Sequence, residues 1–346
     1  MKKNALFVLF VVFTILVGCG QATEKKLTSD PYKETNFLMG TIVTVKVYDE
    51  GKEDVLKPVF DSIHTLSNQI SLEESESEVE KININAGLQP VEVTEDIYRL
   101  IDAGKIYSEK SSGSFDLSIG PLTGLWRIGF DDAKKPKQDE IDAVLPLINY
   151  SDVELNAEEQ TVFLKKKGMQ LDLGAIAKGF IADEVVTILK EHDITTAIID
   201  LGGNIYVMGD NPSGDKWTVG IQNPFAPRGE TIGKVSEANK SIVTSGIYER
   251  FLEIDDTKYH HLLNPKDGYP FMNDIAGVSI ISNKSIDGDA LSTSVFAKGI
   301  KDGMQYIEGF DEVEAIFIST DKKIYISSGL KGVFELTNED FELGNF

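Results

Sequence analysis

The sequence predicts an α+β fold with mixed or antiparallel sheets flanked by helices. Three observations lead to this class: short strand patterns are numerous, helical patterns are few, and several strands look hairpin-linked. A doubly wound parallel sheet would need helices that alternate regularly with the strands. The chain has 346 residues, 41% of them hydrophobic, so it can bury a sizeable core, and it shows no internal repeat.

The first half of the chain supplies one clear strand and several helical patterns. Residues 41–48 alternate between apolar and polar side chains, which predicts a strand. Residues 53–70 carry apolar side chains at helical spacing, and residues 70–83 predict an acidic loop that enters a short helix. Residues 94–113 begin with a capping pattern at Thr94 and predict a longer helix.

The second half is richer in strands. Residues 171–194 predict a strand-like start, a turn of small residues and a helix, and residues 289–308 contain another helix. Residues 195–209 predict two strands separated by Gly202 and Gly203. Further short strands are predicted within residues 216–224, 240–246, 249–265, 275–284, 315–320 and 323–329.

The acidic charge balance excludes one class of partner. The chain has 34 basic and 56 acidic residues, a formal net charge of −22. Binding to a nucleic-acid backbone needs clustered Lys and Arg, so no nucleic acid is expected as a partner. A small phosphate ligand is not excluded, because a metal ion can bring it in.

The N-terminus predicts export and a lipid anchor. Residues 1–18 hold two lysines and a short apolar run, which is typical of a signal peptide and too short for a membrane span. The only cysteine, Cys19, follows Leu-Val-Gly, which resembles a bacterial lipoprotein signal with a lipidated cysteine. Residues 19–36 are polar and predict a flexible tether. The chain is therefore expected at the cell membrane, lipid-anchored on its extracytoplasmic face; the alternative is an uncleaved anchor with an incidental cysteine.

Residues 112–129 form the first candidate ligand-binding segment. Its glycines leave the backbone open to close approach by a ligand, and Ser114 and Asp116 offer polar contacts. Phe115 and Trp126 offer flat apolar faces. The alternative is an ordinary loop of turn residues.

Residues 171–185 form the second segment. Gly174, Ala175 and their neighbours keep the turn before the helix slim, so its free N–H groups can face an anion, and Lys178 adds a positive charge. The alternative is a tight strand-to-helix connection in which Asp172 acts as a local cap.

The third segment, residues 286–299, raises the question of a cation site. If a helix starts near Asp287 or Asp289, then Asp289 and Thr293 share one face and Ser292 lies beside them. A carboxylate, hydroxyls and a nearby carbonyl form a hard oxygen site that suits Mg²⁺. The alternative is that one of the two aspartates caps the helix and the hydroxyls bond back to the turn.

The histidines predict no zinc site. His64 and His192 lie in or near helical patterns and are expected to be structural or solvated. His260 and His261 are adjacent in a strand pattern, so they face opposite sides and only one can serve a site.

In this order, seven segments resemble the ApbE family of flavin transferases. The resemblance covers nearly the whole mature chain, and it assigns residues 37–346 to an ApbE-like FAD-binding catalytic domain. It implies an enzyme that binds FAD with Mg²⁺, transfers FMN to a Thr or Ser hydroxyl of an exported redox protein as a phosphodiester, and releases AMP. The segments are residues 39–41, 112–122, 171–179, 200–204, 244–250, 260–270 and 289–293.

The resemblance also implies roles for individual residues. Asp289 and Thr293 become the metal side chains, with Ser292 as a third and the carbonyl of Ala175 as a backbone ligand. His261 becomes the candidate for proton handling. The residues implied to line FAD are Met39, Ser114, Phe115, Asp116, Asp172, Lys178 and Leu263.

One position departs from the family pattern. Many family members place an aromatic residue that can stack on the cofactor where this chain has Glu73, with no aromatic nearby. A less tightly covered cofactor would admit water, so a Mg²⁺-dependent FAD pyrophosphatase that yields FMN and AMP stays open as an alternative. A non-catalytic flavin-binding lipoprotein is a further alternative.

Overall fold

A computed structural model of the chain describes residues 26–74 and 76–345. In this part of the chain, the largest element is a nine-stranded sheet in the order β1-β2-β6-β7-β10-β13-β14-β15-β17. Neighbouring strands are antiparallel except for β15 and β17, so the predicted α+β class with mixed sheets is confirmed. The strands are β1 (Leu27–Leu38), β2 (Thr41–Asp49), β6 (Ala197–Leu201), β7 (Asn204–Met208), β10 (Lys240–Gly246), β13 (Ile275–Ser282), β14 (Glu314–Ser319), β15 (Lys323–Ile326) and β17 (Glu342–Leu343).

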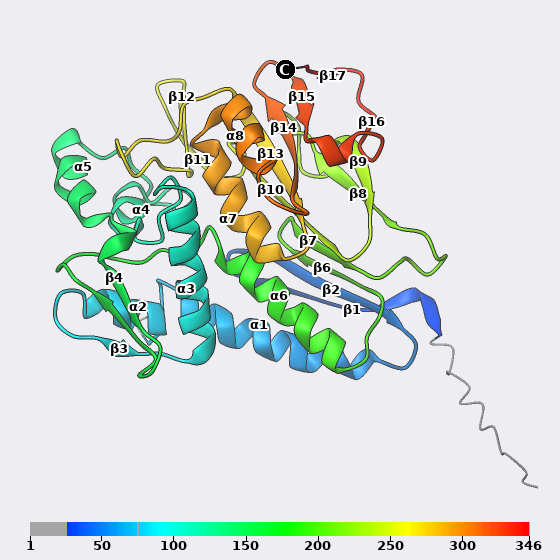
Figure 1. Cartoon of the computed structure of the whole chain (residues 1–346), viewed down its shortest axis with the longest axis horizontal. Helices are drawn as coiled ribbons and strands as arrows, with labels where there is room; N and C mark the ends of the chain where they lie inside the picture. Colours follow the sequence, from blue (N-terminus) through cyan, green and yellow to red (C-terminus); the bar gives the residue numbers. More distant parts are fainter. Residues whose placement is uncertain (1–25, 75, 346) are drawn as a thin grey trace, which may run out of the picture.

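Helices cover one face of this sheet (Figure 1). Helices α6 (Ala177–Glu191) and α7 (Ser285–Phe296) lie side by side, and α7 packs on β10 and β13. The remaining helices are α1 (Leu56–Ile70), α2 (Glu78–Ile84), α3 (Glu95–Lys110), α4 (Gly120–Trp126), α5 (Gln138–Val144) and α8 (Gly299–Ile307).

Smaller sheets complete the fold. The strands β8 (Trp217–Gln222), β9 (Thr231–Glu237) and β16 (Glu335–Leu336) form a sheet that packs on the face opposite α7. The others are β3 (Val91–Glu92), β4 (Val153–Asn156) and β5 (Thr161–Leu164), which pair with one another, and the hairpin of β11 (Phe251–Ile254) and β12 (Thr257–His260).

The alternation of side chains along the central strands explains this layering. In β13, Val278 and Ile280 belong to the core under the helices, while Ile281 belongs to the core under β8 and β9. Neighbouring β14 repeats the pattern with Phe317 and Ile318 on opposite faces. Strands covered on both faces carry apolar residues in a continuous run, as β13 does.

Several local predictions need correction. Residues 27–36 do not form a flexible tether, because they make up most of β1, whose backbone pairs with β2. Residues 171–173, predicted to start a strand, are not in one. Thr94 precedes α3 as predicted but does not cap it, since its hydroxyl donates to Glu78 on α2.

The predicted export signal and Cys19 lie outside the described residues. Among the helices of residues 26–74 and 76–345, none is long and apolar enough to cross a membrane.

Candidate active site

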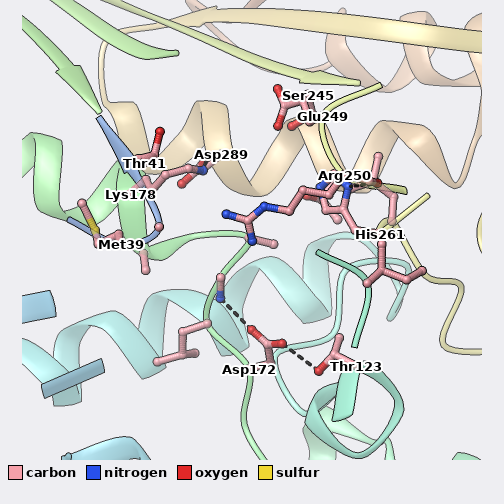
Figure 2. A pocket seen from close by; sticks show the side chains of 18 of the residues that line it. Met39, Thr41, Thr123, Asp172, Lys178, Ser245, Glu249, Arg250, His261 and Asp289 are labelled. Atoms are coloured by element: carbon pink, nitrogen blue, oxygen red, sulfur yellow. Dashed lines mark hydrogen bonds and ion pairs between the residues drawn. The ribbon is translucent and has the colours of Figure 1, made fainter. Parts of the chain in front are cut away.

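A large cleft of about 1350 Å³ opens where α6 and α7 face the β1–β2 turn and the loops around α4 (Figure 2). Ligand sites for drug-sized molecules span about 300–1,000 Å³, so this cleft has room for a dinucleotide. It brings together segments that are far apart in the sequence. The predicted site residues that line it are Met39, Ser114, Phe115, Asp116, Asp172, Ala175, Lys178, His261, Leu263, Asp289 and Thr293.

The wall formed by α6 and α7 depends on the close approach of the two helices. A Cβ at Gly179 would lie 2.4 Å from the carbonyl oxygen of Ser285, so any larger residue would push the helices apart. This approach places the Gly179 amide 2.7 Å from Oδ2 of Asp289, to which it donates, and Lys178 Nζ 3.2 Å from Oδ1. The Asp289 carboxylate is thus buried and held from α6 on one side while it faces the cleft on the other.

The question of whether an aspartate caps α7 has a clear answer. The helix begins at Ser285, before either candidate, and the amides of Ser285 and Ile286 donate to the carboxylate of Asp183 on α6 at 2.7 and 3.0 Å. Asp287 instead accepts a hydrogen bond from the Tyr107 hydroxyl. Because Asp183 supplies the cap from outside the helix, Asp289 is available to the cleft.

Asp183 is itself unusual. Burial raises the pKa of its carboxyl to about 6, although the two backbone amides that donate to it act in the opposite direction. It is a structural group that joins α6 to α7, and sequence reasoning did not single it out.

Three of the four predicted metal ligands lie at the cleft. Asp289, Thr293 and Ala175 all line the cleft and offer a carboxylate, a hydroxyl and a carbonyl oxygen. The Gly179 amide donates to Asp289, and no hydrogen bond reaches the Ala175 carbonyl within the described part of the chain. A set with one carboxylate leaves positions for water and phosphate, as Mg²⁺ prefers, so the residues fit the ion. No cluster of three or more His, Cys, Asp or Glu placed to hold a metal occurs in residues 26–74 and 76–345.

Ser292 is the predicted metal ligand that does not line the cleft. Its side chain is fully buried, its hydroxyl donates to the Asp289 carbonyl at 2.8 Å, and it shares a hydrogen bond with the Ser245 hydroxyl at 2.9 Å. The helical spacing placed it beside Asp289, but the neighbouring strand β10 covers that side of α7. Ser292 therefore supports the wall from behind.

Asp172 shapes the turn that presents Ala175. Its Oδ1 accepts the Gly174 amide at 2.9 Å, and its Oδ2 accepts the hydroxyl of Thr123 on α4 at 2.7 Å. The first of these bonds is the local cap that the sequence left open as an alternative. The second ties the turn to α4, and Thr123 was missed because a lone Thr carries no distinctive signal.

The segment around Asp116 touches the cleft but directs its polar groups inward. The Asp116 carboxylate is buried and accepts hydrogen bonds from the amide and hydroxyl of Ser118 and from the amide of Tyr150. Burial raises the pKa of Asp116, against these hydrogen bonds, which lower it. The Ser114 hydroxyl likewise donates to the Ser111 carbonyl at 2.9 Å. These groups hold the loop in shape, and the cleft receives mainly its backbone and apolar surface.

The two adjacent histidines face different surroundings, as predicted. The buried His260 ring lies 2.7 Å from the Phe271 carbonyl, and only His261 lines the cleft. Nδ1 of His261 lies 3.3 Å from the Arg250 carbonyl, which favours a proton on Nδ1 and a lone pair on Nε2. Burial is the main cause that lowers the pKa of His261 to about 4, and the nearby positive charges of Arg250 and Lys178 act in the same direction, so its ring is neutral at pH 7.

Two arginines of the cleft were not predicted. Arg250 reaches across the centre of the cleft (Figure 2), where a Cβ at Gly129 would lie 2.9 Å from its Cδ and one at Gly40 would lie 3.5 Å from its Nη2. Among the described residues, its guanidinium forms no ion pair within 4.0 Å. Arg228 also lines the cleft and donates to the Gly202 carbonyl at 3.2 Å. Arg250 lies in the matching segment of residues 244–250, but no local pattern distinguishes an arginine that faces a cleft from a solvated one.

Comparison with known proteins agrees with the site. A profile of the ApbE family matches residues 39–317. A Klebsiella pneumoniae protein named FAD:protein FMN transferase is 38% identical over 86% of this chain and 92% of its own length. A Treponema pallidum protein of the same name is 35% identical over 92% of this chain and 93% of its own length.

Solved structures extend the comparison to the fold. The ApbE protein of Thermotoga maritima superposes with a TM-score of 0.80 at 28% identity, covering 88% of this chain and 99% of that one. The flavinyl transferase ApbE of Pseudomonas stutzeri gives a TM-score of 0.77 at 26% identity, covering 88% and 96%. Since the profile spans most of the chain and its segments converge on one cleft, this protein belongs to the ApbE family.

Proposed function

We propose that this chain transfers FMN from FAD to a hydroxyl group of another protein. The observation that carries the proposal is the combination at one cleft of a lysine–aspartate pair, a neutral histidine and an arginine that forms no ion pair within the described part of the chain. Such a cation inside a chain of net charge −22 suits an anionic substrate such as a pyrophosphate. Relatives that are 38% and 35% identical to this chain carry the name of the same activity.

The proposed reaction is an in-line displacement at phosphorus. The oxygen of a Thr or Ser hydroxyl forms a bond with the FMN-side phosphorus of FAD, and the bond from that phosphorus to the bridging oxygen breaks. AMP leaves with the bridging oxygen and its charge, and the product is a phosphodiester. Nε2 of His261 takes the hydroxyl proton, a role for which its neutral ring and free lone pair are suited.

The cleft residues bind and orient the substrate for this step. Arg250 contacts the pyrophosphate at the centre of the cleft, and Lys178 remains paired with Asp289 beside it. Asp289, Thr293 and the Ala175 carbonyl would hold Mg²⁺. When bound, this ion would neutralise charge on the phosphate oxygens.

We propose the location from the predicted export signal and the acceptor from the family resemblance. The acceptor is an exported redox protein at the membrane, and Cys19 carries the lipid that keeps the enzyme on the same extracytoplasmic face. Labelling of cells with a radioactive fatty acid tests this part: label should enter the wild-type chain, and label that persists in Cys19→Ala would contradict the assignment.

The activity is tested by mass. The purified chain, FAD, Mg²⁺ and a candidate acceptor are incubated, and the acceptor is weighed. A gain of one FMN on a Thr or Ser, lost when Mg²⁺ is chelated, is expected. Release of FMN and AMP at an equal rate without acceptor, and no gain of mass, would replace the proposal by the FAD pyrophosphatase; bound FAD with neither product would replace it by a flavin-binding lipoprotein.

A further inference from the structure

The outer lip of the cleft differs from its centre because it presents flat and apolar side chains. Leu72, in the loop after α1, and Phe130, in the loop after α4, both line the cleft although each is more than two-fifths exposed. Exposed apolar side chains that gather at the edge of a binding groove are typical of a ligand-contact surface.

Arg127 also lies on this lip, with its guanidinium over the Phe130 ring. Its guanidinium carbon is 4.5 Å from the centroid of the Phe130 ring, which is stacking distance. Its Nε donates to Asp132 at 2.7 Å, and its Nη2 lies 3.8 Å from Glu73. The side chain is thus held by a ring and two carboxylates, while 39% of it remains exposed and it lines the cleft.

The backbone of the loop after α4 holds Arg127 in place. Arg127 follows α4 in the left-handed conformation, with a φ of 47°, which costs energy for a residue with a Cβ. Its amide donates to the Thr123 carbonyl at 2.8 Å, and its carbonyl accepts the Phe130 amide at 3.1 Å. The loop therefore brings Arg127 and Phe130 to the same place by its own hydrogen bonds.

Arg127 and Arg250 have different electrostatic settings and suit different parts of a ligand. Two carboxylates already compensate the charge of Arg127, whereas Arg250 has no ion pair among the described residues. A compensated guanidinium is a poor phosphate clamp, but its face can still stack on a planar ring. Gly129, between Arg127 and Phe130 in the sequence, packs against the Arg250 side chain, so the lip adjoins the place assigned to the pyrophosphate.

We propose that Arg127 and Phe130 form a stacking platform for a planar ring of FAD, and that Glu73 and Asp132 hold Arg127 in position for it. The inference rests on the proposed function, which it deepens by naming ring-binding residues. FAD carries a flat ring on either side of its pyrophosphate, and either ring has the chemistry that the platform recognises. The experiment distinguishes them.

The test compares dissociation constants for FAD, FMN and AMP across variants of the full chain. Arg127→Ala should weaken FAD binding about tenfold, the effect of losing one ring-stacking contact. Arg127→Lys keeps the charge but loses the planar face, so it should resemble Arg127→Ala. The loss should appear with FMN if the platform holds the isoalloxazine and with AMP if it holds the adenine.

Arg99→Ala is the matched control. Arg99 also lies over a ring, that of Phe180, at 5.2 Å and pairs with carboxylates, but it does not line the cleft. It should leave all three constants unchanged. Steady-state kinetics supply a second readout: Arg127→Ala should raise KM for FAD about tenfold and change kcat less than about threefold.

The outcomes separate the two proposals. Unchanged affinity for FAD in Arg127→Ala, or wild-type affinity in Arg127→Lys, would overturn the platform while leaving the transferase standing. A wild-type chain that binds no FAD would overturn the proposed function itself. An equal loss in Arg99→Ala would show that the effect comes from general destabilisation and would also overturn the platform.

Discussion

The α6–α7 wall and the segment of residues 112–122 both carry a buried aspartate that lines the cleft, and the two aspartates do different work. Asp289 accepts bonds from another helix, and one of its partners is a cleft lysine. Asp116 accepts bonds from its own loop and from Tyr150, which hold that loop in place. A residue's place in a family motif therefore does not by itself assign its chemical role. The role depends on whether its hydrogen-bond partners belong to the cleft or only to its own loop. Substitutions on the wall should therefore change turnover, and those in the loop should change stability.

The largest effect is expected at Asp289. Asp289→Asn keeps the shape of the side chain but removes the negative charge that pairs with Lys178 and that would bind the metal ion. The kcat should therefore fall about 100- to 1,000-fold, as it does when one charge-stabilising group is lost. FMN transfer to the acceptor is the measurement. Asp287→Asn, on the same helix but bonded to Tyr107, is the control and should retain most activity. Equal losses in both variants would mean that helix disruption, and not the wall, is responsible.

The second effect concerns His261. His261→Asn should lower kcat about 100-fold, because a positioned base contributes about that factor. Since the pKa of His261 is lowered to about 4, its ring stays neutral between about pH 5 and pH 8, and wild-type kcat should show no inflection near pH 6.5.

The same shift has a consequence for stability, with a defined sign. The unfolded chain binds a proton on this histidine near pH 6.5 and the folded chain only near 4, so the free energy of unfolding should fall as the pH drops through this window. His261→Asn should weaken that dependence in urea titrations. A kcat profile with an inflection near pH 6.5 that His261→Asn removes would contradict the neutral ring.

The third effect tests the loop. Asp116→Ala leaves the Ser118 and Tyr150 amides without their acceptor, so the free energy of unfolding should fall by about 3 kcal/mol. The kcat of the folded fraction should stay within about threefold of wild type. A variant of full stability that has lost turnover would reverse the comparison and place Asp116 beside Asp289.

The smallest effect on activity is expected at Ser292. Since its hydroxyl is buried behind the wall, Ser292→Ala should change kcat less than about threefold, whereas Thr293→Val should lower it by more than about tenfold. Titration of activity with Mg²⁺ is the measurement. If Ser292→Ala raised the Mg²⁺ requirement as much as Thr293→Val does, Ser292 would be a metal ligand after all.

Much of the fold was predictable because its strands obey a simple periodicity. Residues 41–48 and 275–284 form β2 and β13 as expected, since alternating or continuous apolar runs have few other ways to bury their side chains. Residues 27–36 were wrongly predicted as a flexible tether because they lack such a periodic pattern. Edge strand β1 has many polar and partly exposed residues, and the pairing that makes it a strand comes from β2.

By itself, the sequence determined the family segments, the order of most elements and the helical spacing that puts Asp289 and Thr293 on one face. Only the tertiary structure decided which polar groups face the cleft. Asp183 caps α7 from another helix and leaves Asp289 to the cleft, and strand β10 covers Ser292. The loop after α4 places Arg127 against Phe130, and Arg250 forms no ion pair with any residue that the structure describes. The physical reason is that each of these outcomes depends on a partner distant in the sequence, and a local pattern holds no information about what will pack against it.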